Sequence, residues 1–328
     1  MTGSISNHEL CILNTECGRF SDAAIKEIEK LGDVTHVEAD RSYLLENVVN
    51  YEIMLIALHN TIDREILERA TNLKYIVTPT TGHNHIDCDF AKEKGIQIIS
   101  LRGETEFLET IRATADLAWG LLLSLIRHIP SAHQDVLNAQ WDRNKYYGNE
   151  LKAKVLGVIG YGRLGKMVAQ YGRAFGMFIL AYDQHKFSNK ENTEFVGLDE
   201  LLSRSDVISL HLPLNKHTNQ MLDQNLFQKM KEGMVFINTA RGEIVDEGAL
   251  IEALKSGKVA SAATDVLADE VSLDQDWLKN NKLVNYARSN KNLIITPHIG
   301  GVTYESVEQA NIFIIHKLGH YIRNEKIL

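Results

Sequence analysis

The sequence predicts an α/β protein built from two doubly wound parallel-sheet domains, one inserted into the other. Apolar strand patterns and amphipathic helix patterns alternate along almost the whole chain, which is typical of parallel strands joined by helices. A glycine-rich strand–turn–helix pattern lies at 154–165, in the middle of the chain. The long segment ahead of this pattern must therefore form a unit of its own.

Ahead of the glycine-rich pattern, four strands are expected with helices between them. Ser21 is the expected N-cap of the first helix, and Gly32 is its expected C′ residue. The strands are predicted at 10–14, 51–58, 75–78 and 96–99, and the helices at 21–31, 62–70 and 91–94.

The segment 104–127 is predicted as one long helix that becomes increasingly apolar. Such a helix is buried, and its length indicates packing between domains or in a dimer interface. The alternation then resumes and ends in a helix that must dock on the rest of the chain. The strands are predicted at 155–159, 177–182, 206–211, 233–238, 259–265 and 293–297, and the last helix at 304–328.

The mid-chain pattern has the features of a dinucleotide-binding turn. Gly160 permits a tight turn, Gly162 lets the backbone approach a pyrophosphate, and Gly165 lets the helix pack close to the strand. Asp183 ends the next predicted strand, where it can accept hydrogen bonds from a ribose and repel a 2′-phosphate. The pattern therefore favours a dinucleotide site over a purely structural glycine turn, and NAD over NADP as the dinucleotide.

Composition sets limits on the class of protein. The chain has 328 residues, 44% hydrophobic and 24% charged, which is ordinary for a globular protein. The net charge of −8 argues against a nucleic-acid partner, and an anionic substrate would need a local basic group. No membrane span is expected, since no apolar run approaches roughly 18 residues. No signal peptide is expected, since the first residues have no basic segment ahead of an apolar stretch. Three cysteines, Cys11, Cys17 and Cys88, suit a cytoplasmic location.

Polar side chains follow three strands of the second predicted domain. These are Arg241, Glu270 and His298, and ligands bind beyond the carboxyl ends of such strands. Histidine can donate a proton, a neighbouring carboxylate orients it and favours its protonated form, and a guanidinium binds a carboxylate in a fork. Each residue alone also has an interpretation without catalysis. His298 could be a structural turn residue, Arg241 could be a surface charge, and Glu270 lies in an acidic run. Together they favour an active site.

These motifs, from about residue 75 to about residue 303, resemble those of the D-isomer-specific 2-hydroxyacid dehydrogenases, which include phosphoglycerate, glycerate and D-lactate dehydrogenases. The resemblance implies a Rossmann NAD-binding domain at 103–299, inserted into a flavodoxin-like substrate domain at 1–102 and 300–328, with the chemistry in a cleft between them. It implies NAD-dependent interconversion of a small D-2-hydroxy acid and its 2-oxo acid. Arg241 would bind the substrate carboxylate, and His298, paired with Glu270, would be the acid/base.

The resemblance also implies the ligand contacts. The backbone N–H groups of Thr81 and Gly82 would hold the substrate carboxylate. Thr239 and Ala240 would lie near the nicotinamide, and Asp265 would bond its carboxamide. The full set expected to bind NAD is Gly160, Gly162, Arg163, Leu164, Gly165, Asp183, His211, Pro213, Thr218, Thr239, Ala240, Asp265 and His298.

No metal is expected, because the histidines in the loop 80–87 lack a recognised ligand spacing. The expected partners are a small anionic 2-hydroxy or 2-oxo acid and a second copy of the chain in a homodimer. The 103–115 segment is about one helical turn longer than is usual in the family. The loop after the strand at 54–57 lacks the arginine of phosphoglycerate-type members, although a phosphate could meet Arg102 or His59.

Other functions stay open on the sequence. An NAD(H)-sensing, corepressor-like binding protein and a phosphite-type dehydrogenase share the fold. A formate dehydrogenase is disfavoured, because Glu270 stands where those enzymes have glutamine. No regulatory domain is expected after the terminal helix.

Overall fold

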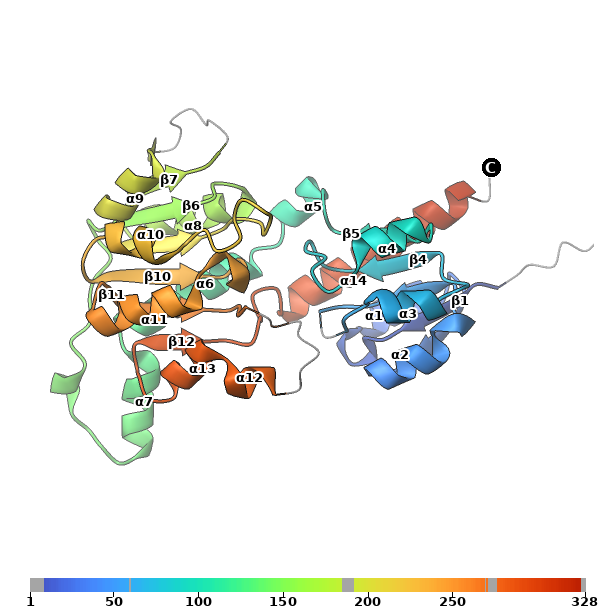
Figure 1. Cartoon of the computed structure of the whole chain (residues 1–328), viewed down its shortest axis with the longest axis horizontal. Helices are drawn as coiled ribbons and strands as arrows, with labels where there is room; N and C mark the ends of the chain where they lie inside the picture. Colours follow the sequence, from blue (N-terminus) through green and yellow to red (C-terminus); the bar gives the residue numbers. More distant parts are fainter. Residues whose placement is uncertain (1–8, 59, 185–191, 269, 271–275, 326–328) are drawn as a thin grey trace, which may run out of the picture. The chain divides into compact units, whose positions relative to one another are not determined.

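The computed structural model describes residues 9–58, 60–184, 192–268, 270 and 276–325. The chain splits into two compact units. Unit 1 comprises Met1–Ile111 and Val302–Leu328, and unit 2 is the continuous segment Arg112–Gly301 (Figure 1). The chain thus passes between the units at 111/112 and 301/302, whereas the sequence placed the boundaries at 102/103 and 299/300.

Unit 1 contains a parallel sheet with the strand order β2-β1-β3-β4-β5. This is the flavodoxin-like order that was predicted. The sequence missed β2, whose residues Asp33–His36 alternate between exposed and half-buried and so form no apolar run. The strands are β1 Cys11–Asn14, β2 Asp33–His36, β3 Ile53–Leu55, β4 Tyr75–Thr78 and β5 Gln97–Ser100.

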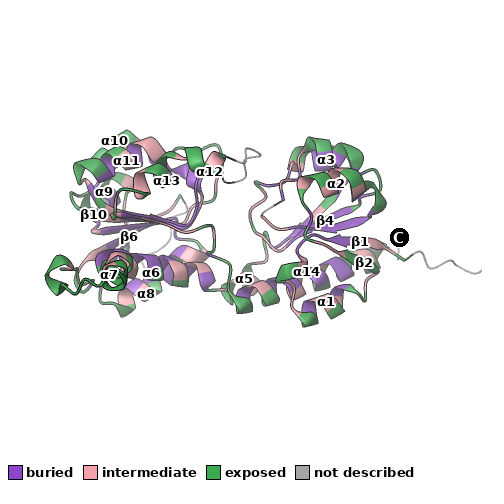
Figure 2. Cartoon of the chain, turned by 90° about the horizontal axis from the view of Figure 1, so that it is seen from below, coloured by how far each residue is buried: buried purple, intermediate pink, exposed green. Residues whose placement is uncertain are grey.

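Helices cover both faces of the unit 1 sheet, as Figure 2 shows by the buried strands between them. Neighbouring strand residues point to opposite faces, so Ile12 joins the core layer beneath α1 and α14 while Leu13 joins the layer beneath α2, α3 and α4. The helices are α1 Asp22–Ile28, α2 Arg41–Asn47, α3 Arg64–Arg69, α4 Cys88–Glu93, α5 Thr105–Glu109 and α14 Tyr304–Glu325, with short 3-10 turns at Cys17–Arg19 and Val48–Asn50.

The start of α1 agrees with the sequence and its end does not. Ser21 is the N-cap, and its hydroxyl oxygen accepts from the Ala24 N–H at 3.2 Å. The C-cap, however, is Glu29, so the prediction of Gly32 as the C′ residue was wrong. Gly32 has another physical reason, because a Cβ there would overlap the Leu10 carbonyl oxygen.

Unit 2 contains a parallel sheet with the order β12-β11-β10-β9-β6-β7-β8. When the sheet is read from β8 to β12 and β6 is numbered as strand 1, the order is 3-2-1-4-5-6 followed by a seventh strand. This is the Rossmann arrangement. The predicted pair of parallel-sheet domains is therefore confirmed. The strands are β6 Val155–Ile159, β7 Phe178–Tyr182, β8 Thr193–Phe195, β9 Val207–Leu210, β10 Met234–Asn238, β11 Val259–Thr264 and β12 Leu293–Ile295.

The two core layers of unit 2 lie on opposite faces of this sheet. Helices α6 and α8 pack on one face, and α9, α10, α11 and α13 pack on the other. The helices are α6 Ala113–Ile126, α7 Ile129–Leu137, α8 Arg163–Ala174, α9 Leu198–Arg204, α10 Gln224–Lys229, α11 Glu247–Ser256, α12 Trp277–Asn280 and α13 Lys282–Ala287, with 3-10 turns at Arg143–Lys145 and Gly242–Ile244.

The predicted single helix at 104–127 is wrong, because the structure has two helices, α5 and α6, with a break between them. The halves belong to different units. Phe107 of α5 stacks on Phe313 of α14 with ring centroids 4.0 Å apart, both in unit 1. The apolar α6 instead packs against β10, β11 and α8 in unit 2, so its composition is that of a core helix.

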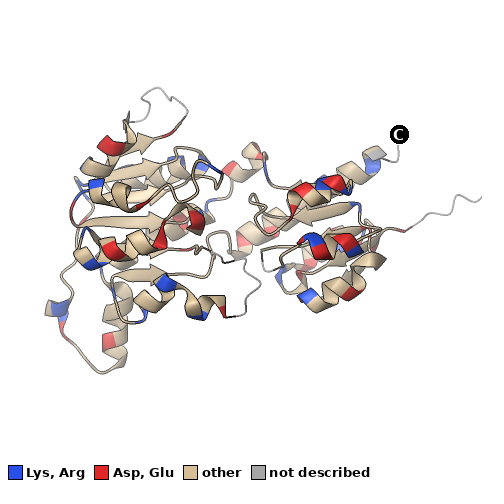
Figure 3. Ribbon diagram, in the orientation of Figure 1, with Lys and Arg blue, Asp and Glu red and all other residues tan. Residues whose placement is uncertain are grey.

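Charged side chains lie mainly on the helices and loops, and acidic and basic residues are interspersed there (Figure 3). Among the described residues, no helix is long and apolar enough to cross a membrane.

Candidate active site

The glycine turn between β6 and α8 has the geometry that its sequence predicts. Gly160 has φ +92°, and a Cβ there would lie 2.6 Å from the His211 carbonyl oxygen. A Cβ on Gly165 would overlap the Gly160 carbonyl oxygen, so both positions exclude a side chain. Gly162 caps α8 without a side-chain hydrogen bond, and the space beside its Cα is open. The N–H groups of the first turn can therefore receive an anionic ligand.

Asp183 follows β7 and is tied to the glycine turn. Its Oδ2 accepts from the Tyr161 N–H at 2.8 Å, and the side chain is half-buried. The structure thus places a carboxylate beside the turn that precedes α8. The predicted ribose contact would place this charge beside the 2′ position of the ribose, where it disfavours a second negative charge.

Replacing Asp183 with asparagine should raise the preference for NADPH relative to NADH by about tenfold or more. Asparagine keeps an oxygen for the Tyr161 N–H and removes only the charge. The ratio of kcat/KM for the two cofactors checks this. Asp199→Asn, which alters a surface carboxylate paired with Lys229, is the control and should leave the ratio unchanged. If the ratio of kcat/KM for NADPH and NADH is the same in Asp183→Asn and in the wild type, Asp183 does not select between the two cofactors.

Two polar atoms at the carboxyl ends of β9 and β10 are buried without a partner among the described residues. They are His211 Nδ1 and Thr239 Oγ1. The other ring nitrogen of His211 lies 2.8 Å from Ser209 Oγ, and burial lowers the pKa of His211 to about 4, so the ring is neutral near pH 7. Buried polar groups usually have partners, so these atoms fit a site that a polar ligand completes.

Thr218 lies in the turn that follows β9, and its predicted contact with the cofactor stays a prediction. Its hydroxyl donates to the Pro213 carbonyl oxygen at 2.7 Å and accepts from the Asn215 N–H at 2.8 Å. It therefore closes the turn that follows β9. Pro213 itself is exposed.

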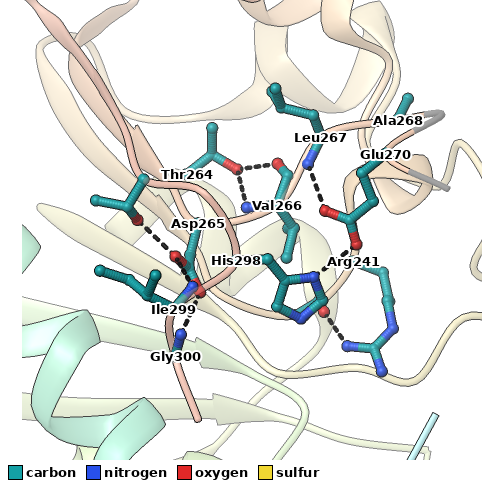
Figure 4. A network of polar contacts seen from close by, with 12 residues as sticks. Arg241, Thr264, Asp265, Val266, Leu267, Ala268, Glu270, His298, Ile299 and Gly300 are labelled. Atoms are coloured by element: carbon teal, nitrogen blue, oxygen red, sulfur yellow. Dashed lines mark hydrogen bonds and ion pairs between the residues drawn. The ribbon is translucent and has the colours of Figure 1, made fainter. Parts of the chain in front are cut away.

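Arg241, Glu270 and His298 follow β10, β11 and β12, three neighbouring parallel strands. Their carboxyl ends meet at one edge of the sheet, and Figure 4 shows the three side chains there. His298 Nδ1 lies 2.7 Å from Glu270 Oε1. Because the carboxylate can only accept, it holds the tautomer with a proton on Nδ1 and leaves Nε2 for proton exchange. The ring is 26% exposed, so Nε2 is shielded but can be reached.

Asp265 holds the turn that carries His298. The His298 backbone is left-handed with φ 52°, which is uncommon outside glycine, and its N–H donates to the Asp265 carbonyl oxygen at 2.8 Å. The buried Asp265 carboxylate accepts from Thr296 Oγ1 at 2.6 Å, the Ile299 N–H at 2.9 Å and the Gly300 N–H at 2.7 Å (Figure 4). Burial raises the pKa of Asp265, and these hydrogen bonds oppose that rise. Its predicted bond to a carboxamide stays a prediction.

Asn238 fixes the loop that carries Arg241, and the sequence analysis missed it. Its side-chain oxygen accepts from the Ala240 N–H at 3.0 Å, and its amide donates to the Arg241 carbonyl oxygen at 3.0 Å. The Arg241 guanidinium donates to the Ala240 carbonyl oxygen at 2.6 Å. The signal was present, because Asn238 is a polar residue at the end of an apolar strand.

The predicted substrate loop lies in unit 1, after β4. Thr80 Oγ1 donates to the Gly82 carbonyl oxygen at 2.8 Å and lies 3.0 Å from Thr78 Oγ1, which fixes the loop. The N–H groups of Thr81 and Gly82 donate to no acceptor in the described chain. His85 in the same loop is buried, and no three described His, Cys, Asp or Glu side chains are grouped as metal ligands.

The strand order and the glycine turn define unit 2 as a dinucleotide-binding domain. The family described as D-isomer specific 2-hydroxyacid dehydrogenase, NAD binding domain, matches residues 119–300. The chain belongs to the D-isomer-specific 2-hydroxyacid dehydrogenases, a family of NAD-dependent oxidoreductases, as its motifs predict.

Individual relatives agree in length and fold. Hydroxypyruvate reductase of Thermotoga maritima is 35% identical over 87% of this chain and 90% of its own length. Glyoxylate reductase of Thermococcus litoralis is 35% identical over 94% of this chain and 92% of its own length. The crystal structure of D-lactate dehydrogenase from Aquifex aeolicus, complexed with NAD and lactic acid, superposes with a TM-score of 0.80 at 30% identity, covering 96% of each chain.

One relative is much longer. D-3-phosphoglycerate dehydrogenase of Archaeoglobus fulgidus is 38% identical over 90% of this chain but only 54% of its own length. The chain therefore spans about half of that protein.

Proposed function

We propose that the chain reduces a small 2-oxo acid to the D-2-hydroxy acid, and catalyses the reverse oxidation, with His298, Glu270 and Arg241 as its catalytic residues. The observation that carries the proposal is the His298–Glu270 pair at 2.7 Å, at the same sheet edge as Arg241. The orphaned polar atoms His211 Nδ1 and Thr239 Oγ1, together with the open glycine turn, fit a bound NAD.

The proton step falls to His298. Bound NADH supplies the hydride for the carbonyl carbon, so one proton must reach the carbonyl oxygen. His298 donates it from Nε2 and becomes neutral imidazole. Glu270 stabilises the imidazolium before transfer and keeps the ring oriented through Nδ1. In the oxidation, the neutral ring takes the proton back.

Arg241 binds the carboxylate of the substrate through its guanidinium and draws electron density from the adjacent carbonyl. The bond from Asn238 to the Arg241 carbonyl oxygen keeps this residue in place. In unit 1, the N–H groups of Thr81 and Gly82 are proposed to donate to a carboxylate, because they donate to no acceptor among the described residues.

The relatives' names indicate the substrate class. Hydroxypyruvate and glyoxylate reductases match almost the full chain, which favours a short 2-oxo acid. A panel of 2-oxo acids with NADH, followed at the nicotinamide absorbance, tests this. Tight NADH binding without turnover of any of them would contradict the enzyme assignment.

We also propose a homodimer that forms through α7 and the segment after it, where large apolar side chains are exposed. Burying these side chains against a second copy would remove them from water. They are Ile129, Val136, Leu137, Trp141 and Tyr147.

Replacing Leu137 and Trp141 with glutamate should convert the dimer to a monomer, because each substitution places a charge in the apolar contact. Light scattering coupled to size exclusion measures the mass. A monomeric wild type, or a dimeric variant, contradicts the proposed interface. The cytoplasmic location stays a prediction.

A further inference from the structure

Arg102 lies at the same edge of the unit 1 sheet as the loop Thr81–Gly82. Strands β4 and β5 are parallel neighbours, with Thr78 opposite Ser100. The two loops that leave them are joined by a hydrogen bond from the Leu101 N–H to the Thr80 carbonyl oxygen at 3.1 Å. Arg102 and Thr81 are the next residues along each loop, so they are held close together by the backbone.

The Arg102 guanidinium has no partner in the part of the chain that the structure describes. It is exposed, while its backbone N–H is fixed to Ser100 Oγ at 3.2 Å. The carboxylate two residues along, Glu104, pairs with Lys317 at 2.6 Å. In a chain with a net charge of −8, this leaves a cation available for an external anion.

His83 adds a further donor to this loop. Its Nε2 is buried with no hydrogen bond in the described chain. Burial, and then the charge of Arg102, lower the pKa of His83, so the ring is neutral and Nε2 can carry a single donated proton. The charge of Arg102 also opposes the rise that burial causes in the pKa of Cys88, which agrees with its position beside this loop.

We propose that Arg102, with His83 beside it, is a second anion anchor next to the carboxylate loop, so that the preferred substrate is a 2-oxo acid with a second anionic group. The inference rests on the proposed function. The two free N–H groups of Thr81 and Gly82 already suffice for one carboxylate, whereas Arg102 and His83 are additional donors. A guanidinium fork accepts a carboxylate or a phosphate equally well.

Two matched substrate pairs test the anchor. 2-Oxoglutarate and 2-oxopentanoate differ by a terminal carboxylate, and 3-phosphohydroxypyruvate and hydroxypyruvate differ by a phosphate. In Arg102→Gln, kcat/KM should fall about 10- to 100-fold for the doubly anionic member of the preferred pair, and less than about twofold for its partner. The pair that responds identifies the second group. Arg102→Lys should recover part of the loss, because it restores a point charge without the fork.

The matched control is Arg69→Gln. Arg69 is an exposed arginine of unit 1 at the C-terminal end of α3, and its loss removes only surface contacts. It should leave both pairs unchanged. If Arg102→Gln lowers kcat/KM equally for both members of a pair, or for neither member, the proposal that Arg102 is an anion anchor is wrong.

Binding measured calorimetrically in the presence of NAD⁺, without turnover, separates this inference from the proposed function. Selective loss of 2-oxoglutarate or 3-phosphohydroxypyruvate binding in Arg102→Gln supports the anchor even if no 2-oxo acid is reduced. Equal binding by variant and wild type overturns the anchor, whatever the activity.

Discussion

Replacing His298 with asparagine should lower kcat for 2-oxo acid reduction by about 10²- to 10⁴-fold, because the forming alkoxide then lacks its proton donor. Asparagine suits the test, since it tolerates the left-handed backbone, φ 52°, that this position requires. The affinity for NADH should fall far less than kcat, because the glycine turn and Asp183 are untouched. Single-turnover kinetics and NADH fluorescence titration give the two values.

Glu270→Gln separates orientation from charge. Glutamine can still accept from Nδ1–H of His298, but it carries no negative charge to stabilise the imidazolium, so kcat for reduction should fall, by less than in His298→Asn. A wild-type kcat in His298→Asn would contradict the assigned proton donor. A wild-type kcat in Glu270→Gln would contradict only the role of the carboxylate.

Replacing Arg241 with alanine should raise KM and lower kcat together, with a combined loss of about 10²- to 10³-fold in kcat/KM. The guanidinium is proposed to bind the substrate carboxylate and to polarise the carbonyl, so both the ground state and the transition state lose an interaction. Initial rates over a range of 2-oxo acid concentrations measure both constants.

The control for Arg241 is Arg204→Ala, which removes an exposed arginine of α9 that pairs with Glu194 and Glu200. It should leave both constants unchanged. A rise in KM for Arg241→Ala at constant kcat would limit Arg241 to binding, and unchanged constants would contradict its role altogether.

Most of the sheet architecture followed from sequence pattern. The apolar run 155–159 coincides with β6, and 75–78 coincides with β4, because buried parallel strands are nearly continuous apolar runs. β2 was missed for the converse reason. Its residues Asp33–His36 form the edge of the sheet, and none is fully buried.

The errors came from tertiary contacts that local pattern cannot contain. The helix periodicity at 104–127 runs through the break at 110–112, since Phe107 packs on α14 while α6 packs beneath the other sheet. Gly32 looked like a helix terminator, but the close approach of the Leu10 carbonyl explains it.

At the site, strand position placed His298 and Glu270 at one sheet edge, and the family resemblance implied their pairing, which the structure has at 2.7 Å. The backbone bonds of Asn238 and of the Asp265 carboxylate could not be predicted, because they depend on turn conformations such as the left-handed His298.

The discontinuity of unit 1 has a consequence for the order of events during synthesis. Helix α14 supplies Ile314, Ile315 and Leu318 to one core layer of unit 1, and these residues leave the ribosome after the whole of unit 2. Unit 2 is continuous and carries its own core, so it can fold while the chain is still growing. The part of the sheet face beneath α14 stays uncovered until this helix has been synthesised, which makes unit 1 the later-folding unit.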